Sequence, residues 1–407
     1  MSHLRRYLTL QQASFSALFW LPIFYEFQRL SGLPDTKIFA IQSAYYLAFC
    51  FLEIPTGYLA DRFSYRLCLI SSGAVVTVAN LLPVLVPTFA GFFAHFMLLA
   101  LARSLNSGAS SAYLYESLKA EGKAPEYREW EGRIRSVALL VQLVSYASAG
   151  VMMAAYRPAP YLASVIAGVI SLGAALKLPV LSPAAVPVEA ARQAAGPARP
   201  RSAGILGPLT ALVAAWRSTP LLIPTMLMGA VMFVLARVGQ VNLFQPVLVL
   251  KGMPLAGHGF MMAALAGAEA LASARSSLAH RYLGREGGHP SRVIFLLTAG
   301  LCISWALVAP FPGYWAVAPF LGTSVFFGMI YPVQKQLMND LIPDSRLRAT
   351  LLSAESLIDR GIVSAVSFVA GVYVADGKVL TFVWLSGLAG LIWALGCQKM
   401  TKMLLTS

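Results

Sequence analysis

Charged side chains are scarce in this sequence, and acidic ones most of all. Asp and Glu number 17 in 407 residues, all four charged types together make up 12%, and 58% of the residues are hydrophobic. Soluble domains carry about a quarter charged residues, so this composition argues against a soluble fold. Disorder is also excluded, because 11% of the residues are aromatic and disordered segments have few aromatics.

Motifs for phosphate binding, hydrolysis and metal binding are also missing. The sequence holds no P-loop, no GxSxG and no HExxH, which argues against an ATP-driven pump and against the hydrolase and zinc-protease classes. We therefore expect no enzymatic activity and no cofactor. No CxxC pair occurs, and the cysteines lie in or beside apolar segments, where we expect them to act as small buried hydrophobic residues: Cys50, Cys68, Cys302 and Cys397.

Long apolar segments fill most of the chain instead. A segment of about 20 apolar residues is long enough to cross a bilayer as a helix. The sequence predicts twelve such spans, at residues 8–30, 38–60, 67–88, 90–115, 136–156, 160–182, 219–249, 257–279, 293–311, 315–338, 350–373 and 379–398.

The spans divide into two sets of six. Residues 1–182 and 219–407 each form a predicted six-helix bundle, and residues 183–218, which are rich in Ala, Pro and Arg, form a predicted linker. Two short matches relate the halves: Leu59-Ala60-Asp61-Arg62-Phe63 resembles Leu278-Ala279-His280-Arg281-Tyr282, and Arg133-Ile134-Arg135 resembles Arg346-Leu347-Arg348. Such internal repeats are common in secondary transporters, with the substrate path between the halves.

The net charge of +14 comes from basic residues between the spans. We interpret it as membrane topology and not as nucleic-acid binding, because the basic residues gather in alternate loops, as in cytoplasmic loops. Both termini are therefore expected in the cytoplasm. The predicted cytoplasmic residues include Arg62, Arg66, Lys119, Lys123, Arg128, Arg133, Arg135, Arg281, Arg285, Arg346, Arg348, Lys399 and Lys402, and the outside residues are Arg29, Lys37, Arg157, Lys251 and Lys378.

The loop between the second and third spans carries the most specific motif. The segment from Gly57 to Arg66 resembles the G-x-L-a-D-r-x-G-r-[KR] signature of the major facilitator superfamily, with Ser64 and Tyr65 as departures. The preceding Glu53-Ile54-Pro55-Thr56-Gly57 resembles the drug-exporter-like bacterial members. The resemblance implies an all-α fold of two six-helix bundles and a conformational gate at Gly57, Asp61, Arg62 and Arg66. The alternative is a loop that only sets topology.

Ionisable residues inside spans are costly and are usually paired, solvated or functional. The candidates for a substrate or proton path are Glu26, Arg103, Arg237, Glu269, Asp359 and Arg360, and Glu53 is expected to pair structurally with a loop arginine. Glu355 and Lys335 lie near enough to a span end to snorkel.

Each candidate has an alternative interpretation. Glu26 is either an interfacial carboxylate in water or a cavity group that binds a proton or a cation. Arg103 either snorkels to the cytoplasm or pairs with a carboxylate. We expect Arg237 and Glu269 to form a buried ion pair, either at or beside the cavity or with a purely structural role. At least one of Asp359 and Arg360 is expected to face the cavity, since adjacent residues point to different faces of a helix.

Four side chains permit a copper path. Met228 with Met232, and His258 with Met262, are spaced one helical turn apart, and thioether and imidazole groups bind Cu(I). The pairs resemble a copper-importing branch of the superfamily. The alternative is apolar filling, which is common for Met.

The sequence thus predicts a secondary transporter that works by alternating access. The expected activity is proton-coupled efflux of a small amphipathic organic compound from a bacterial-type inner membrane by a monomer in the lipid bilayer. Aromatic side chains of the first half suit such a compound: Phe15, Phe19, Tyr25, Tyr45, Tyr46 and Phe49. Import of copper, a vitamin or a siderophore is the alternative, and a membrane-embedded sensor or enzyme is a remote one.

Overall fold

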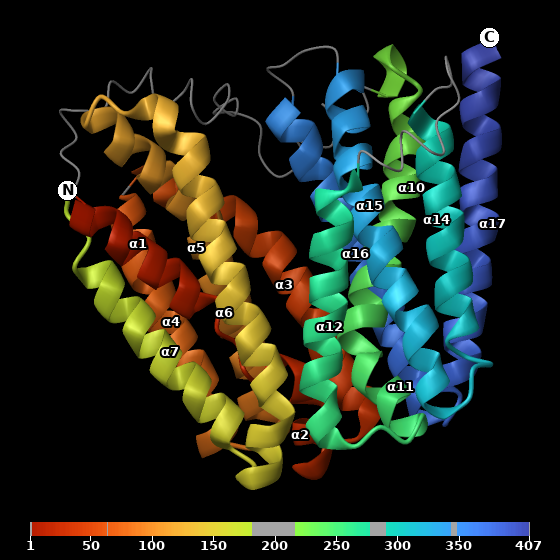
Figure 1. Cartoon of the computed structure of the whole chain (residues 1–407), viewed down its shortest axis with the longest axis horizontal. Coiled ribbons are helices and arrows are strands. Elements are labelled where there is room, and N and C mark those ends of the chain that lie inside the picture. The colour runs from red at the N-terminus through yellow and green to blue at the C-terminus, as the bar shows by residue number, and fades with distance from the viewer. Residues whose placement is uncertain (1, 63, 181–215, 277–289, 343–347, 407) are drawn as a thin grey trace. The chain divides into compact units, whose positions relative to one another are not determined.

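The computed structural model describes residues 2–62, 64–180, 216–276, 290–342 and 348–406, and they are helical apart from short connections (Figure 1). The predicted linker lies almost wholly outside these residues. The chain divides into two compact units. Unit 1 comprises Met1–Ala198 with Leu255–Phe260, and unit 2 comprises Arg199–Pro254 with Met261–Ser407.

Unit 1 is built from helices of the first half. Ser64 and Thr88 cap two of them, since their hydroxyls accept hydrogen bonds from the amides of Leu67 and Gly91. The helices are α1 (Ser2–Phe15), η1 (Leu21–Ile23), α2 (Phe24–Leu30), α3 (Asp35–Arg62), α4 (Tyr65–Leu85), α5 (Phe89–Ala120), η2 (Ala124–Glu126), α6 (Tyr127–Ala155) and α7 (Ala159–Leu176).

Unit 2 contains the helices of the second half, although α12 begins in the segment grouped with unit 1. They are α10 (Leu222–Arg237), the π-helical η4 (Val238–Asn242), α11 (Phe244–Leu250), α12 (Leu255–Ala274), α14 (Pro290–Leu307), η5 (Gly313–Ala316), α15 (Val317–Leu341), α16 (Arg348–Ala375) and α17 (Val379–Thr406). After α11, burial lowers the pKa of the Lys251 ammonium, which donates hydrogen bonds to the carbonyls of Ala309 and Phe311 at 2.8 and 2.6 Å.

Ten helices among the described residues are long and apolar enough to cross a membrane. They correspond to ten of the twelve predicted spans. The other two predicted spans are 8–30, which is divided between α1 and α2, and 38–60, which lies within the 28-residue helix α3. The all-α fold predicted from the sequence is confirmed.

The first span is not the continuous helix that the sequence predicted. α1 ends at Phe15, and the backbone is irregular or 3-10 helical until α2 begins at Phe24. Pro22 contributes to the break, because it has no backbone N–H to donate. Non-helical backbone at membrane depth is stable only where the protein satisfies its polar groups.

Side chains of α4 and α7 supply those partners. The amide of Phe19 donates to the Ser164 hydroxyl at 3.0 Å, and the Trp20 indole N–H donates to Oδ1 of Asn80 at 2.8 Å. Asn80 in turn donates to the carbonyl of Ser164 at 3.2 Å. Trp20 is fully buried and stacks on Tyr161 with ring centroids 5.7 Å apart. The break is therefore a packed feature of unit 1.

We expect Asn80→Ala to destabilise the protein by about 2 kcal/mol, because it leaves the buried Trp20 N–H and the Ser164 carbonyl without their partner. The measurement is chemical unfolding of the purified protein, followed by tryptophan fluorescence. Gln336→Ala, which removes an exposed amide on α15, serves as the control and is expected to change stability little. Equal effects of the two variants would contradict the role given to Asn80.

The seventh predicted span is also interrupted. α10 ends at Arg237, and a π-helical turn, Val238–Asn242, precedes α11. Two of its side chains form hydrogen bonds to neighbouring helices. Asn242 donates to the Ser367 hydroxyl on α16 at 2.7 Å, and Gln240 donates to the Ser324 hydroxyl on α15 at 3.0 Å. The first span of each half is thus broken.

Glycines allow two helix pairs to pack almost backbone to backbone, one pair in each unit. A Cβ added at Gly73 of α4 would lie 2.9 Å from Leu172 Cα on α7, and one at Gly168 of α7 would lie 2.6 Å from Thr77 Oγ1 on α4. In unit 2, a Cβ at Gly387 of α17 would lie 2.8 Å from the Cys302 carbonyl oxygen on α14. Close approach through small residues is typical of membrane helices.

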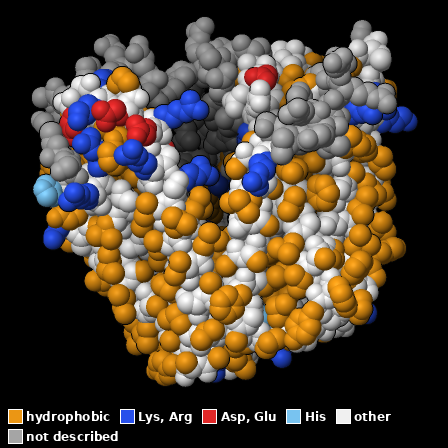
Figure 2. Space-filling model, viewed as in Figure 1, with side chains coloured by type: hydrophobic (Ala, Val, Ile, Leu, Met, Phe, Trp, Pro, Cys, Tyr) orange, Lys and Arg blue, Asp and Glu red, His pale blue; other side chains and the backbone are white. Residues whose placement is uncertain are grey.

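Hydrophobic side chains cover the outward surface of unit 1, and charged side chains gather at one end of it, over the ends of α5 and α6 (Figure 2). Leu140, Val144 and Ile166 are 61% or more exposed. Such a surface is stable against lipid and not against water. We call the end of unit 1 that holds the start of α1, the end of α5 and the start of α6 its charged end.

Candidate functional site

Polar groups of unit 1 converge beside the break in the first span. Nε2 of Gln11 donates to Asn106 Oδ1 at 3.2 Å and to the Ser171 hydroxyl at 3.4 Å. Gln12 and Asn106 exchange hydrogen bonds at 3.1 and 3.2 Å. This amide cluster joins α1, α5 and α7, and its last member on α1 is Gln12, three residues before that helix ends.

A cavity of about 200 Å³ lies next to the amide cluster. It holds one acid, Glu131, which accepts a hydrogen bond from Ser111 at 2.9 Å, and one exposed base, Arg135. Its other lining residues are Leu8, Gln12, Ser16, Ser110, Ile134, Ala138, Leu139 and Gln142. The sequence interpretation missed Gln12, Glu131 and Gln142, because one sequence does not tell which face of a helix borders a cavity.

Arg103 lies in the middle of α5 and is partly buried. Its Nη1 donates a hydrogen bond to the hydroxyl of Tyr45 on α3 at 3.0 Å. Tyr46 and Tyr146 are the other titratable side chains near it. In the described part of the chain no ion pair to Arg103 is formed, so the carboxylate partner, one of its two interpretations, is not seen there.

A buried charge cluster occupies unit 2. Glu355 of α16 is 2% exposed, accepts a hydrogen bond from Gln334 at 3.0 Å and pairs with Lys335 of α15 at 2.6 Å. Gly229 of α10 gives the cluster room, because a Cβ there would collide with the Gln334 amide. The expected snorkelling of Glu355 and Lys335 to the span end is thus wrong for Glu355, whose carboxylate turns inward.

Asp359 lies one turn after Glu355 and is 6% exposed. The charges acting on it are those of Glu355, Lys335 and Arg360. Among the described residues it forms no direct hydrogen bond or ion pair. Asp359 is therefore a deeply buried carboxyl group near the carboxylate of Glu355, which already pairs with Lys335.

Arg237 and Glu269 do not form the buried ion pair that we expected. Arg237 is exposed, and its guanidinium lies over the ring of Phe233, 5.4 Å from the centroid. Glu269 is partly buried, and the two charges act on each other without an ion pair within 4 Å. The sequence gives the position of Arg237 along the span but does not tell on which face of the helix its side chain lies.

Glu26 is 9% exposed at the start of α2. Arg29 lies one turn later on the same helix, 3.9 Å away, and neighbouring Tyr25 donates to Asp35 at 2.7 Å. Glu26 is thus a buried carboxylate beside a guanidinium, and both of its interpretations stay predictions.

The motif loop is only partly described. Gly57, Asp61 and Arg62 belong to the end of α3, and their side chains, like that of Glu53, lie outside the described part. Arg66 donates to the carbonyls of Leu178 and Leu176 at 2.6 and 2.8 Å, and so ties the start of α4 to the end of α7. It thus contacts backbone carbonyls at the end of α7, and the gate stays a prediction.

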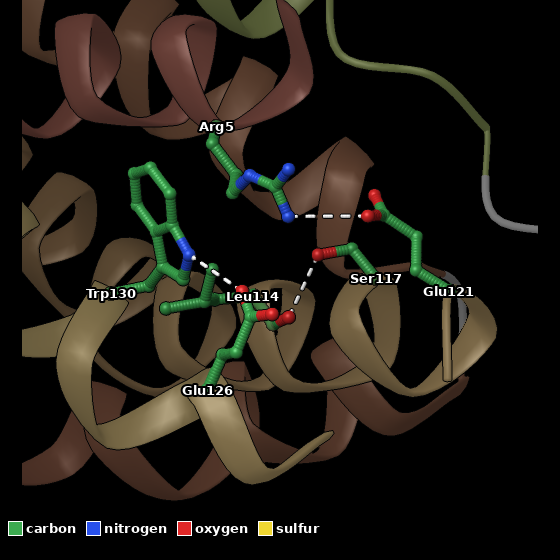
Figure 3. A network of polar contacts seen from close by, with 6 residues as sticks. All are labelled: Arg5, Leu114, Ser117, Glu121, Glu126 and Trp130. Atoms are coloured by element: carbon green, nitrogen blue, oxygen red, sulfur yellow. Dashed lines mark hydrogen bonds and ion pairs between the residues drawn. The ribbon is translucent and has the colours of Figure 1, made fainter. Parts of the chain in front are cut away.

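The charged end of unit 1 holds a second buried ion pair (Figure 3). Arg5 pairs with Glu121 at 3.1 Å, the two side chains being 11% and 6% exposed, and its guanidinium lies 4.8 Å from the Trp130 ring centroid. Trp130 donates to Glu126 at 3.2 Å. The sequence did not indicate this pair, since the two residues are 116 positions apart.

The four copper candidates are buried. Met228, Met232, His258 and Met262 are 5% exposed or less, with the first two on α10 and the others on α12. The copper path stays a prediction. The described residues contain no group of three or more His, Cys, Asp or Glu side chains that could hold a metal ion.

Comparison with known proteins identifies the architecture. The sequence profile of the Major Facilitator Superfamily matches residues 8–367. No curated protein sequence matches the chain.

Solved structures match almost the whole length of the chain. The nucleoside transporter NupG has a TM-score of 0.75 and 15% identity over 98% of both chains. A POT family transporter in complex with 5-aminolevulinic acid has a TM-score of 0.71 and 10% identity over 99% of this chain and 96% of that one. A mutant of peptide transporter POT in complex with sulfate has a TM-score of 0.73 and 14% identity over 99% of this chain and 94% of that one. At these identities the likeness shows the fold.

Proposed function

We propose a specific activity for this chain, which belongs to the Major Facilitator Superfamily and is a multi-pass membrane transporter, not an enzyme. In the proposal, the protein couples proton movement to the efflux of a small amphipathic organic compound. Transport proceeds by alternating access in a bacterial-type inner membrane, with both termini in the cytoplasm and one chain as the working unit. In this proposal Gly57, Asp61, Arg62 and Arg66 form the gate.

The observation that carries the proposal is the state of Asp359. A charged carboxylate buried at this depth without a direct partner is costly, whereas a protonated carboxyl group is much less so. Glu355, one turn away, adds like-charge repulsion that disfavours a second negative charge. A buried carboxyl group to which a conformational change can bring water or a cation has the property required of a proton carrier.

The aromatic residues of unit 1 support an amphipathic substrate. Tyr45, Tyr46 and Phe49 form a chain of ring contacts on α3, with Tyr45 5.2 Å from Tyr46 and 6.3 Å from Phe49 between centroids. Aromatic surface with hydroxyl groups binds compounds that carry both apolar and polar parts. Glu26, Arg237, Glu269 and Arg360 complete the proposed path.

Flux in proteoliposomes tests the proposal. Purified protein is reconstituted, a pH gradient is imposed in either direction, and uptake of a panel of amphipathic organic compounds is followed. We expect at least one compound to move against the proton gradient and to do so faster as the gradient grows. A flux that is indifferent to the gradient would remove proton coupling, and movement together with protons would replace efflux by import.

A further inference from the structure

Among the residues that the structure describes, Arg103 has no anionic partner. Its direct hydrogen-bond partner is the neutral hydroxyl of Tyr45, and the other groups acting on it are the tyrosines Tyr46 and Tyr146. A permanently charged guanidinium at this depth is costly unless it is solvated or paired. In the described chain no carboxylate supplies that charge to Arg103.

The direction of the side chain excludes snorkelling to the charged end of unit 1. Arg103 lies fourteen residues after the start of α5 at Phe89, about 21 Å along the helix, and Tyr45 lies ten residues after the start of α3 at Asp35, about 15 Å along it. Both helices run toward the charged end. The guanidinium is therefore held on the side away from that end, as expected for a side chain that points toward its helix N-terminus.

Two residues that line the cavity of unit 1 are hydrogen-bonded to neighbours of Arg103. Gln142, which lines it, donates to the Tyr146 hydroxyl one turn deeper on α6 at 2.6 Å. Gln12, which also lines it, is bonded to Asn106, one turn from Arg103 on α5. Glu131 and Arg135 carry opposite charges about three and two turns from Gln142, toward the charged end, so the lining charges of the cavity lie away from Arg103.

We propose that Arg103, with the Tyr45 hydroxyl, binds a carboxylate group of the transported compound. The inference rests on the proposed transport function and names its substrate class as small amphipathic organic acids. The planar guanidinium presents two parallel N–H groups that match a carboxylate, and the tyrosine rings contact the apolar body. Lipid phosphate does not reach this position, since Arg103 lies mid-helix and points away from the charged end.

Matched acids and amides test the proposal by binding to the detergent-purified protein. The probes are benzoate with benzamide, salicylate with salicylamide, and indole-3-acetate with indole-3-acetamide, measured by thermal shift and by calorimetry. We expect at least one acid to bind at least about tenfold more tightly than its amide. Arg103→Gln abolishes that preference, Arg103→Lys retains part of it, and Tyr45→Phe weakens it.

Controls separate binding from folding. Tyr156→Phe and Arg133→Gln remove exposed groups and are expected to leave the preference unchanged, and elution as a single symmetric peak shows that each variant is folded. If no acid is preferred over its amide, or if Arg103→Gln keeps the preference, the proposal is wrong. Flux measurements make the two failures distinguishable. If no acid is preferred but the parent protein transports a neutral compound, only the acid class is rejected, whereas acid binding without any flux rejects only transport.

Discussion

Asp359→Asn is expected to reduce proton-driven transport at least about 100-fold, an effect typical of the loss of a proton-transfer group. The amide has the shape of the protonated carboxyl group but can neither release nor accept the proton. Because Asp359 is 6% exposed and has no direct partner in the described structure, the variant should fold as the parent does. Uptake into proteoliposomes under an imposed pH gradient measures the loss.

Exchange of labelled for unlabelled substrate, without a gradient, distinguishes coupling from binding. Asp359→Asn should retain exchange, because the helices can still change conformation with the uncharged group in place. Asp376→Asn is the matched control, since that side chain is 57% exposed in the turn after α16 and should leave both activities intact. Full gradient-driven uptake by Asp359→Asn would show that another group carries the proton.

The second large effect concerns stability. Lys335→Met removes the cation from Glu355, which is 2% exposed and would keep only the hydrogen bond from Gln334. Leaving a buried charge uncompensated commonly costs about 3 kcal/mol or more, so the unfolding midpoint of the purified variant should fall clearly. Lys399→Met, at an exposed position on α17, should not lower it.

The double variant Lys335→Met with Glu355→Gln should recover most of the lost stability. Removing both charges eliminates the desolvation penalty together with the attraction, and such replacements are often neutral. A double variant as unstable as Lys335→Met alone would mean that the lysine acts through its packing and not through its charge.

Helix content, approximate span positions and the family were available from the sequence, because long apolar segments and the loop motif are local signals. The breaks in the first and seventh spans could not be predicted from the sequence, although Pro22 lies in the first of them. Their stability comes from distant side chains, namely Asn80 and Ser164 for the first span and Ser367 for the seventh. A single span therefore looks continuous until its neighbours are known.

For the candidate site as well, the sequence predicted some properties of each residue and not others. Depth along a helix can be counted, and it correctly placed Arg103, Glu269 and Asp359 in the interior of their helices. The face of the helix and the partner cannot be counted. For that reason Arg237 was expected to be buried and is exposed, while Glu355 was expected to reach the surface and is buried against Lys335.

The glycine contacts between α4 and α7 determine which helices of unit 1 can rearrange. Two backbones in direct contact, with Gly73 and Gly168 on opposite helices, cannot slide past each other without a collision. Arg66 fastens the same pair at one end. We therefore expect α4 and α7 to behave as one rigid pair. Any motion that opens or closes the transport path within unit 1 would then involve the other helices, and the broken first span is the expected hinge.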